Sequence, residues 1–187
     1  MRRLNGDEAL NSSISPQLVL VGTSGSGKTT IGREIAARCG FNLTEDIDIL
    51  QSEYSRSFGD LIVDEDFPFD RALEEAGERL LSGGCDIAVL SPSQARHQRI
   101  IDRLIALKEQ GTAVVLLQLP IDQAARRVGL NAPRSVGLGA PRSQFAMMTR
   151  ELDRTYLEFA SFSCDTGSKT PSEVAENIIV ACKMATV

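Results

Sequence analysis

The 187-residue sequence contains a single histidine, and its four cysteines are scattered along the chain without a C-x-x-C pair. Because zinc sites need clustered Cys and His ligands, we expect no zinc site and interpret the cysteines as buried, reduced thiols. The chain also lacks any block of Lys or Arg, and its formal net charge is −5. Since nucleic acid attracts dense positive charge, this balance argues weakly against nucleic acid as the main partner.

Long apolar runs are also missing, because no run reaches the roughly 18 residues that cross a bilayer. Residues 1–16 are polar and contain no signal-peptide core. We therefore expect no membrane partner, a cytoplasmic location, a flexible N-terminal extension over residues 1–16, and one domain over residues 17–187. An apolar content of 42% is enough for one buried core, and we expect a monomer.

A glycine-rich segment after the first apolar run, residues 18–21, matches G-x-x-x-x-G-K-[ST]. A chance match is the alternative, but an apolar strand pattern precedes the motif, and an amphipathic helix pattern over residues 28–39 follows it. Backbone N–H groups of such a loop and the helix N-terminus attract phosphates, Lys28 can reach the outer phosphates, and the Thr29 hydroxyl can bind Mg²⁺. The residues expected to bind nucleotide are Gly22, Ser24, Gly25, Ser26, Gly27, Lys28, Thr29 and Thr30.

Strand and helix patterns alternate along the rest of the chain, which predicts an α/β fold with a parallel sheet covered by helices on both faces. Ligands of such sheets bind at the carboxyl ends of the strands. Further strands are expected at 41–43, 86–90, 113–119 and 161–164, further helices at 49–57, 59–63, 69–81, 95–110, 121–128, 142–160 and 172–184, and a loop at 129–141.

Three segments carry a resemblance to a known family: VLVGTSGSGKTTIGR at 19–33, ARRVGLN at 125–131 followed by Arg134, and DTGSKTP at 165–171. Together they resemble shikimate kinase, a member of the nucleoside monophosphate kinase group. The resemblance implies a three-layer α/β/α fold with five parallel strands in the order 2-3-1-4-5. It also implies a lid at about 129–141 and transfer of the ATP γ-phosphoryl group to a ring hydroxyl.

The resemblance also implies roles for residues outside the loop. Arg127 and Pro171 would flank the adenine, and Arg134 would close over the transferring phosphoryl group. Asp46 would reach Mg²⁺ through water beside Thr29, and Asp48 would hold the acceptor hydroxyl.

The register of these acids stays open, because Glu45 competes for the first place. A solvated acidic turn that caps the next helix is the structural alternative for all three acids.

The acceptor side departs from the family pattern in three places. Asp70 stands where the family has an arginine, Leu152 replaces a second arginine, and Pro92, Ser93 and Gln94 stand at a glycine triplet. Since a desolvated carboxylate needs fixed cations, we expect shikimate to be a poor acceptor. Arg71 and Arg154 lie close enough in sequence to compensate in part.

The sequence therefore predicts an ATP- and Mg²⁺-dependent kinase for a hydroxyl of a small metabolite, with an altered acceptor pocket. One alternative is a nucleotide-binding, non-catalytic paralogue with a regulatory role. A second is an unrelated P-loop ATPase, although the expected strands run into Ser91 and Pro120 rather than into the aspartate that such enzymes need. A third is a gluconate kinase-like enzyme, whose lid and adenine segments fit less well.

Overall fold

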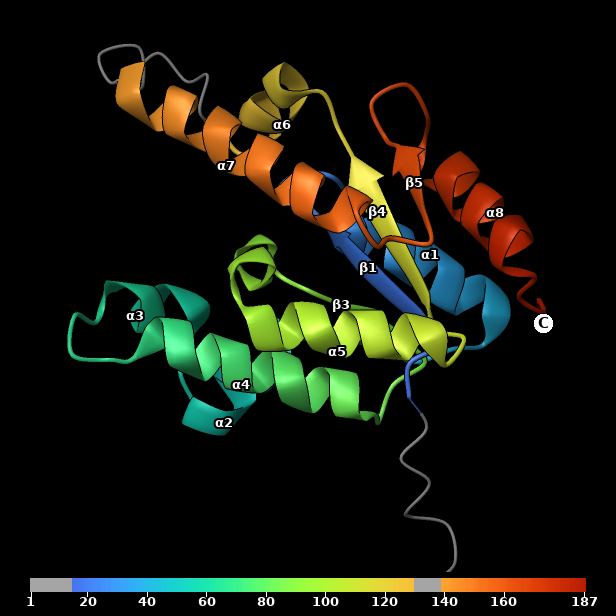
Figure 1. The fold of residues 1–187 in the computed structure, drawn as a ribbon, viewed down its shortest axis with the longest axis horizontal. Coiled ribbons are helices and arrows are strands. Elements are labelled where there is room, and N and C mark those ends of the chain that lie inside the picture. Colours follow the sequence, from blue (N-terminus) through green and yellow to red (C-terminus); the bar gives the residue numbers. More distant parts are fainter. Residues whose placement is uncertain (1–14, 130–138) are drawn as a thin grey trace, which may run out of the picture.

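The computed structural model describes residues 15–129 and 139–187. Five parallel strands form one sheet in the order β2-β3-β1-β4-β5, as the resemblance implied (Figure 1). The first strand is central, since Leu20 pairs with Val89 on one side and with Val115 on the other. The strands are β1 (Leu18–Gly22), β2 (Leu43–Glu45), β3 (Ile87–Val89), β4 (Ala113–Gln118) and β5 (Phe162–Asp165).

Helices cover both faces of the sheet because successive side chains of a strand point to opposite faces. Val19 and Val21 pack under α4, α5 and α7, whereas Leu18 and Leu20 pack under α1 and α8. A smaller apolar cluster joins α2, α3 and α4 beside the sheet. The helices are α1 (Lys28–Cys39), α2 (Asp46–Tyr54), α3 (Phe58–Val63), α4 (Phe69–Ser82), the 3₁₀-helix η1 (Pro92–Arg96), α5 (Gln98–Glu109), α6 (Ile121–Arg127), α7 (Gly139–Leu157) and α8 (Pro171–Cys182).

Several predicted boundaries move for local reasons. The second strand begins at Leu43 rather than at residue 41, because the Phe41 N–H still bonds the Ala36 carbonyl and closes α1. The next helix begins at Asp46 rather than at residue 49, which places two acids in its first turn, where the helix dipole favours negative charge. The predicted helix over 95–110 is divided, since η1 ends at Arg96 and α5 starts at Gln98.

The structure also bears on the ends of two other predicted segments, the loop over 129–141 and the N-terminal extension over 1–16. Helix α7 already begins at Gly139, so 139–141 are helical, while the rest of the expected lid from residue 130 to 138, with Arg134, lies outside the described residues. Pro16 is buried, and its carbonyl accepts a hydrogen bond from Thr112 Oγ1 at 2.7 Å, so this residue packs against the start of β4. Among the described helices, none is long and apolar enough to cross a membrane.

Candidate active site

The phosphate-binding loop joins β1 to α1 at the carboxyl end of the central strand, the end toward which the arrow of β4 also points in Figure 1. Its first glycine has no room for a side chain, because a Cβ on Gly22 would lie 2.4 Å from the Leu117 carbonyl oxygen. Gly27 caps α1 with a left-handed backbone at φ 91°. The loop is therefore fixed between β4 and the helix N-terminus, where N–H groups can receive an anion.

Lys28 is held inside this loop, with only 9% of the residue exposed. Its ammonium donates hydrogen bonds to the carbonyls of Gly22 at 2.7 Å and Thr23 at 3.1 Å. Burial lowers the pKa of Lys28 from 10.5 to about 8, although the charges of Asp46 and Glu45 raise it. At neutral pH the loop thus contains a desolvated ammonium, which is the charge that phosphate groups need.

Glu45, at the end of β2, is the acid that meets the loop hydroxyl. The Thr29 Oγ1 donates to Glu45 Oε2 at 3.0 Å. Burial raises the pKa of Glu45, and the Thr29 hydrogen bond opposes that rise. A hydroxyl and a carboxylate side by side are typical Mg²⁺ ligands beside nucleotide phosphates, so the residues present fit that ion.

Asp46, which the sequence analysis predicted to bind Mg²⁺ through water, contacts Ser91 and Gln94 after β3. Its side chain is 1% exposed, and its Oδ2 accepts hydrogen bonds from the Ser91 N–H, the Ser91 hydroxyl and Gln94 Nε2, each at 2.9 Å. Burial raises the pKa of Asp46, and these donors oppose the rise. The charge of Asp46 also raises the pKa values of Lys28 and Tyr156.

Asp48, predicted to hold the acceptor hydroxyl, lies on a different face of α2 from Asp46. Residues two apart on a helix point about 200° apart, so Asp46 and Asp48 cannot serve one site on α2. Asp48 is exposed and lines an open hollow with Ser52, Glu53 and Arg79 on the outer side of α2 and α4. Of the three acids, Glu45 bonds the loop hydroxyl, Asp46 is buried against Ser91 and Gln94, and Asp48 is exposed on α2. Among the described residues, no group of three or more Asp, Glu, His or Cys could hold a metal ion alone.

Arg127, which is predicted to lie against the adenine, is the last residue of α6. Its guanidinium donates to the Gly25 carbonyl at 3.0 Å and to the Thr166 carbonyl at 3.5 Å. It thereby joins the phosphate-binding loop to the loop after β5. Pro171 is the first residue of α8, next to the Thr170 cap, and is exposed.

Comparison with known proteins decides the family. The family model "Shikimate kinase" matches residues 24–183. The chain belongs to the shikimate kinase family. Curated shikimate kinases from Streptomyces avermitilis and Thermobifida fusca are each 32% identical to it, over 90% and 89% of this chain and 96% and 94% of theirs.

A solved structure, the shikimate kinase from Acinetobacter baumannii in complex with shikimate, shares the fold, with a TM-score of 0.75 and 19% identity over 92% of this chain and 97% of that one. The protein is thus a shikimate kinase-like small-molecule kinase of the ATP-using transferase class, and the alternatives of an unrelated ATPase and a gluconate kinase-like enzyme are set aside.

On the predicted acceptor side, the structure shows charged contacts of Asp70 that the sequence analysis did not predict. Asp70, at one family arginine position, is paired with Arg96 at 2.6 Å, and its Oδ1 lies 3.7 Å from His97 Nε2. The Arg71 side chain is 80% exposed and paired with Glu75 along α4. The helix predicted over 95–110 includes Arg96 and His97, and its periodicity did not single out either residue.

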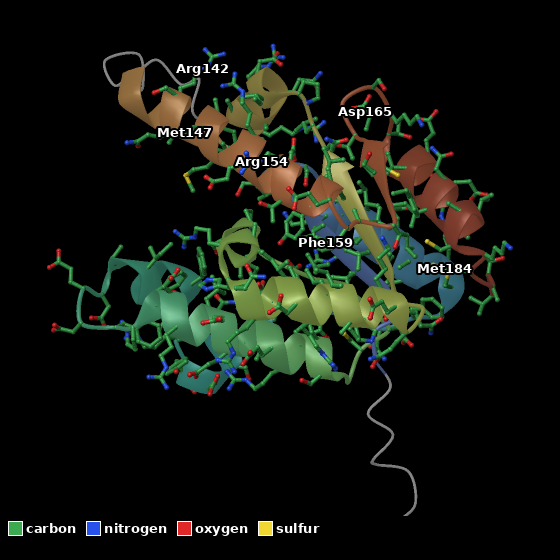
Figure 2. The ribbon with its side chains drawn as sticks, viewed as in Figure 1. Arg142, Met147, Arg154, Phe159, Asp165 and Met184 are labelled. Carbon is green, nitrogen blue, oxygen red and sulfur yellow. The ribbon has the colours of Figure 1, made fainter. Side chains whose placement is uncertain are left out.

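Helix α7 contains the second position at which the resemblance implied an arginine. Leu152 is buried with Tyr156 under the sheet, and Arg154 lies exposed on α7, where Figure 2 labels it. The Tyr156 hydroxyl has no hydrogen-bond partner among the described residues, and burial raises the pKa of Tyr156.

Proposed function

We propose that this protein transfers the γ-phosphoryl group of ATP, with Mg²⁺, to a ring hydroxyl of a small metabolite. The observation that carries the proposal is the convergence of Lys28, the Thr29–Glu45 pair and Asp46 at the carboxyl ends of β1 and β2. Phosphoryl transfer depends mainly on positioning and charge neutralisation, which these groups supply.

Each group then has one task. The loop N–H groups and Lys28 hold the β- and γ-phosphates, while Thr29 and Glu45 would hold Mg²⁺, which would supply charge neutralisation at the phosphates. The acceptor hydroxyl oxygen forms a bond to the γ-phosphorus as the bond from that phosphorus to the ADP oxygen breaks. Asp46 receives the hydroxyl proton, so ADP leaves with the electron pair of the broken bond. Arg127 and Pro171 position the adenine, and Arg134 remains the predicted lid arginine.

We further propose that the acceptor lacks a carboxylate or carries a positive group. Support comes from Asp70 and Leu152 at the two family arginine positions and from the outward direction of Arg71. A substrate carboxylate beside Asp70 would compete for Arg96 and lose a charged hydrogen bond, which typically costs about 1.5–3 kcal/mol.

The test is phosphoryl transfer from γ-labelled ATP to matched ring acceptors: shikimate, its uncharged methyl ester, and neutral or amine-bearing ring polyols. We expect the ester or an amine-bearing ring to exceed shikimate in kcat/KM. A shikimate kcat/KM of about 10⁴ M⁻¹s⁻¹ or more would keep the kinase and overturn the altered pocket. ATP binding with transfer to no acceptor would instead favour the non-catalytic alternative.

Variants test the phosphate site separately. Lys28→Ala should lower turnover on the order of 10²-fold or more, because it removes a main contact to developing charge. The matched control is Lys108→Ala, an exposed lysine on α5, which should leave turnover unchanged. Wild-type turnover in a folded Lys28→Ala protein would refute the kinase mechanism.

A second set of variants tests which of the three acids, Glu45, Asp46 or Asp48, serves Mg²⁺ and which receives the hydroxyl proton. Glu45→Gln should raise the Mg²⁺ concentration needed for half-maximal turnover, since it weakens the Thr29–Glu45 pair. Asp46→Asn should lower kcat with little change in that Mg²⁺ requirement, and Asp48→Asn should change neither. A raised Mg²⁺ requirement in Asp46→Asn alone would restore the register first predicted from the sequence.

A further inference from the structure

Gln94 contacts the acceptor-side acid from the place where the family has its glycine triplet. The Gln94 side chain is fully buried in η1, and its Nε2 donates to Asp46 Oδ2 at 2.9 Å and to the Leu73 carbonyl at 2.7 Å. Two acceptors at one end of the amide fix its orientation, because a flipped amide would set its oxygen against a carboxylate and a carbonyl. Gln94 therefore links Asp46 to α4 in one defined geometry.

A glycine on α4 makes room for this amide. A Cβ on Gly77 would lie 2.4 Å from Gln94 Nε2 and 2.9 Å from Gln94 Cδ. Such a distance is too short for any real contact, so a side chain at residue 77 would displace the amide. A buried glycine inside a helix usually lowers helix stability, and the packing against Gln94 gives this one a reason.

Three of the donors to the Asp46 carboxylate meet at a single oxygen, and the Ile47 N–H is a further donor to this group. The Ser91 N–H, the Ser91 hydroxyl and Gln94 Nε2 bond Asp46 Oδ2, and none of these three bonds goes to Oδ1. A carboxylate whose Oδ2 is fixed in this way cannot rotate freely about its Cβ–Cγ bond. Its other oxygen is thereby aimed in one direction.

We propose that Gln94 is a positioning residue for phosphoryl transfer, which holds Asp46 so that Oδ1 meets the acceptor hydroxyl. This inference rests on the proposed function, since it assumes that Asp46 receives the hydroxyl proton. Gln94 acts through Asp46 and contacts neither ATP nor the acceptor.

The first test separates kcat from ATP binding. Gln94→Met keeps the buried volume and removes the donor, so kcat should fall about tenfold or more, while the KM for ATP stays within about twofold, because misplacement by about 1 Å can cost 10²-fold. The control is Gln98→Met, which removes an exposed amide on α5 that bonds Asp102. Wild-type kcat in Gln94→Met, alongside loss of turnover in Lys28→Ala, would overturn the role of Gln94 and leave the proposed function intact.

The second test displaces the Gln94 amide by a substitution on α4. Gly77→Ala should lower kcat as Gln94→Met does, and adding it to Gln94→Ala should cost nothing more, because the clashing amide is gone. The control is Gly59→Ala on α3, where the nearest atom to a new Cβ is 3.8 Å away. Additive losses in the double variant would refute the linkage.

The third test does not depend on turnover. In a crystal structure of Gln94→Met, the Asp46 carboxylate should leave its position against Ser91. An unmoved carboxylate would overturn the proposal even if no acceptor had been identified.

Discussion

Removing the charge of Lys28 should make the ligand-free protein more stable. The ammonium is 9% exposed, and burial lowers its pKa from 10.5 to about 8. That difference corresponds to about 3 kcal/mol by which the folded state disfavours the charged form, and it already includes the attraction of Asp46 and Glu45. Lys28→Met keeps the aliphatic stem and removes this cost.

Part of the gain is offset by lost hydrogen bonds. The Thr23 carbonyl keeps its bond from the Ser26 N–H, so the main loss is the bond to the Gly22 carbonyl, about 1 kcal/mol. The net gain is about 2 kcal/mol at pH 7. For a chain of this size that corresponds to a rise in Tm of about 4–8 °C.

The stability that Lys28→Met gains over wild type must decrease as pH rises. Below pH 8 the lysine is charged in both states and the cost is fully present. As pH rises from about 8 to 10.5, the folded protein loses the proton before the unfolded chain does, so wild-type stability rises relative to the variant. At pH 10.5 the variant should therefore be less stable than wild type by about 1 kcal/mol, the lost hydrogen bond.

The assay is thermal unfolding by circular dichroism at pH 7 and pH 10.5, without nucleotide and with a chelator, with Lys108→Met as the exposed control. Other groups titrate equally in both proteins and cancel in the difference. A variant no more stable than wild type at pH 7, or a difference unaffected by pH, would refute the reasoning.

The remaining predictions concern stability and are checked by urea or thermal unfolding. Gly32→Ala should destabilise the fold by about 1–3 kcal/mol, because its Cβ would lie 2.5 Å from Leu43 Cδ1, whereas Gly59→Ala should be neutral or slightly stabilising; equal effects would contradict the packing. Thr170→Ala should cost about 1 kcal/mol by removing the capping box of α8, and an unchanged midpoint would count against that cap. Tyr156→Phe should stabilise by up to about 1 kcal/mol, since the hydroxyl is buried without a partner among the described residues, and a clear loss would reveal a partner.

The sequence was sufficient for the features that depend on local chemistry. The strand, phosphate-binding loop and helix from Leu18 to Cys39 agree with prediction, because glycines fix the loop and Gly40 closes the helix with a left-handed backbone. The sheet order came from the resemblance and is confirmed by the strand pairing.

The acceptor side could not be placed because it depends on contacts between distant segments. Asp46 meets Ser91 and Gln94, which lie 45 and 48 residues later, and Asp70 meets Arg96, 26 residues later. Periodicity gives no signal for such pairs. If the acidic segment moved by one residue along the chain, a different acid would face the phosphate-binding loop. Composition alone cannot establish this register.

The central place of β1 has a consequence for synthesis. Leu20 pairs with Val89 and Val115, which follow it by 69 and 95 residues, so the phosphate-binding loop leaves the ribosome long before either neighbouring strand exists. Gly22 approaches the Leu117 carbonyl, so the loop cannot take its final form until β4 is made. A nascent chain that stops near residue 110 presents β1 with a bare edge, which invites pairing with other chains. ATP therefore cannot act as an early template for folding, and its stabilising effect begins only after most of the chain has been translated.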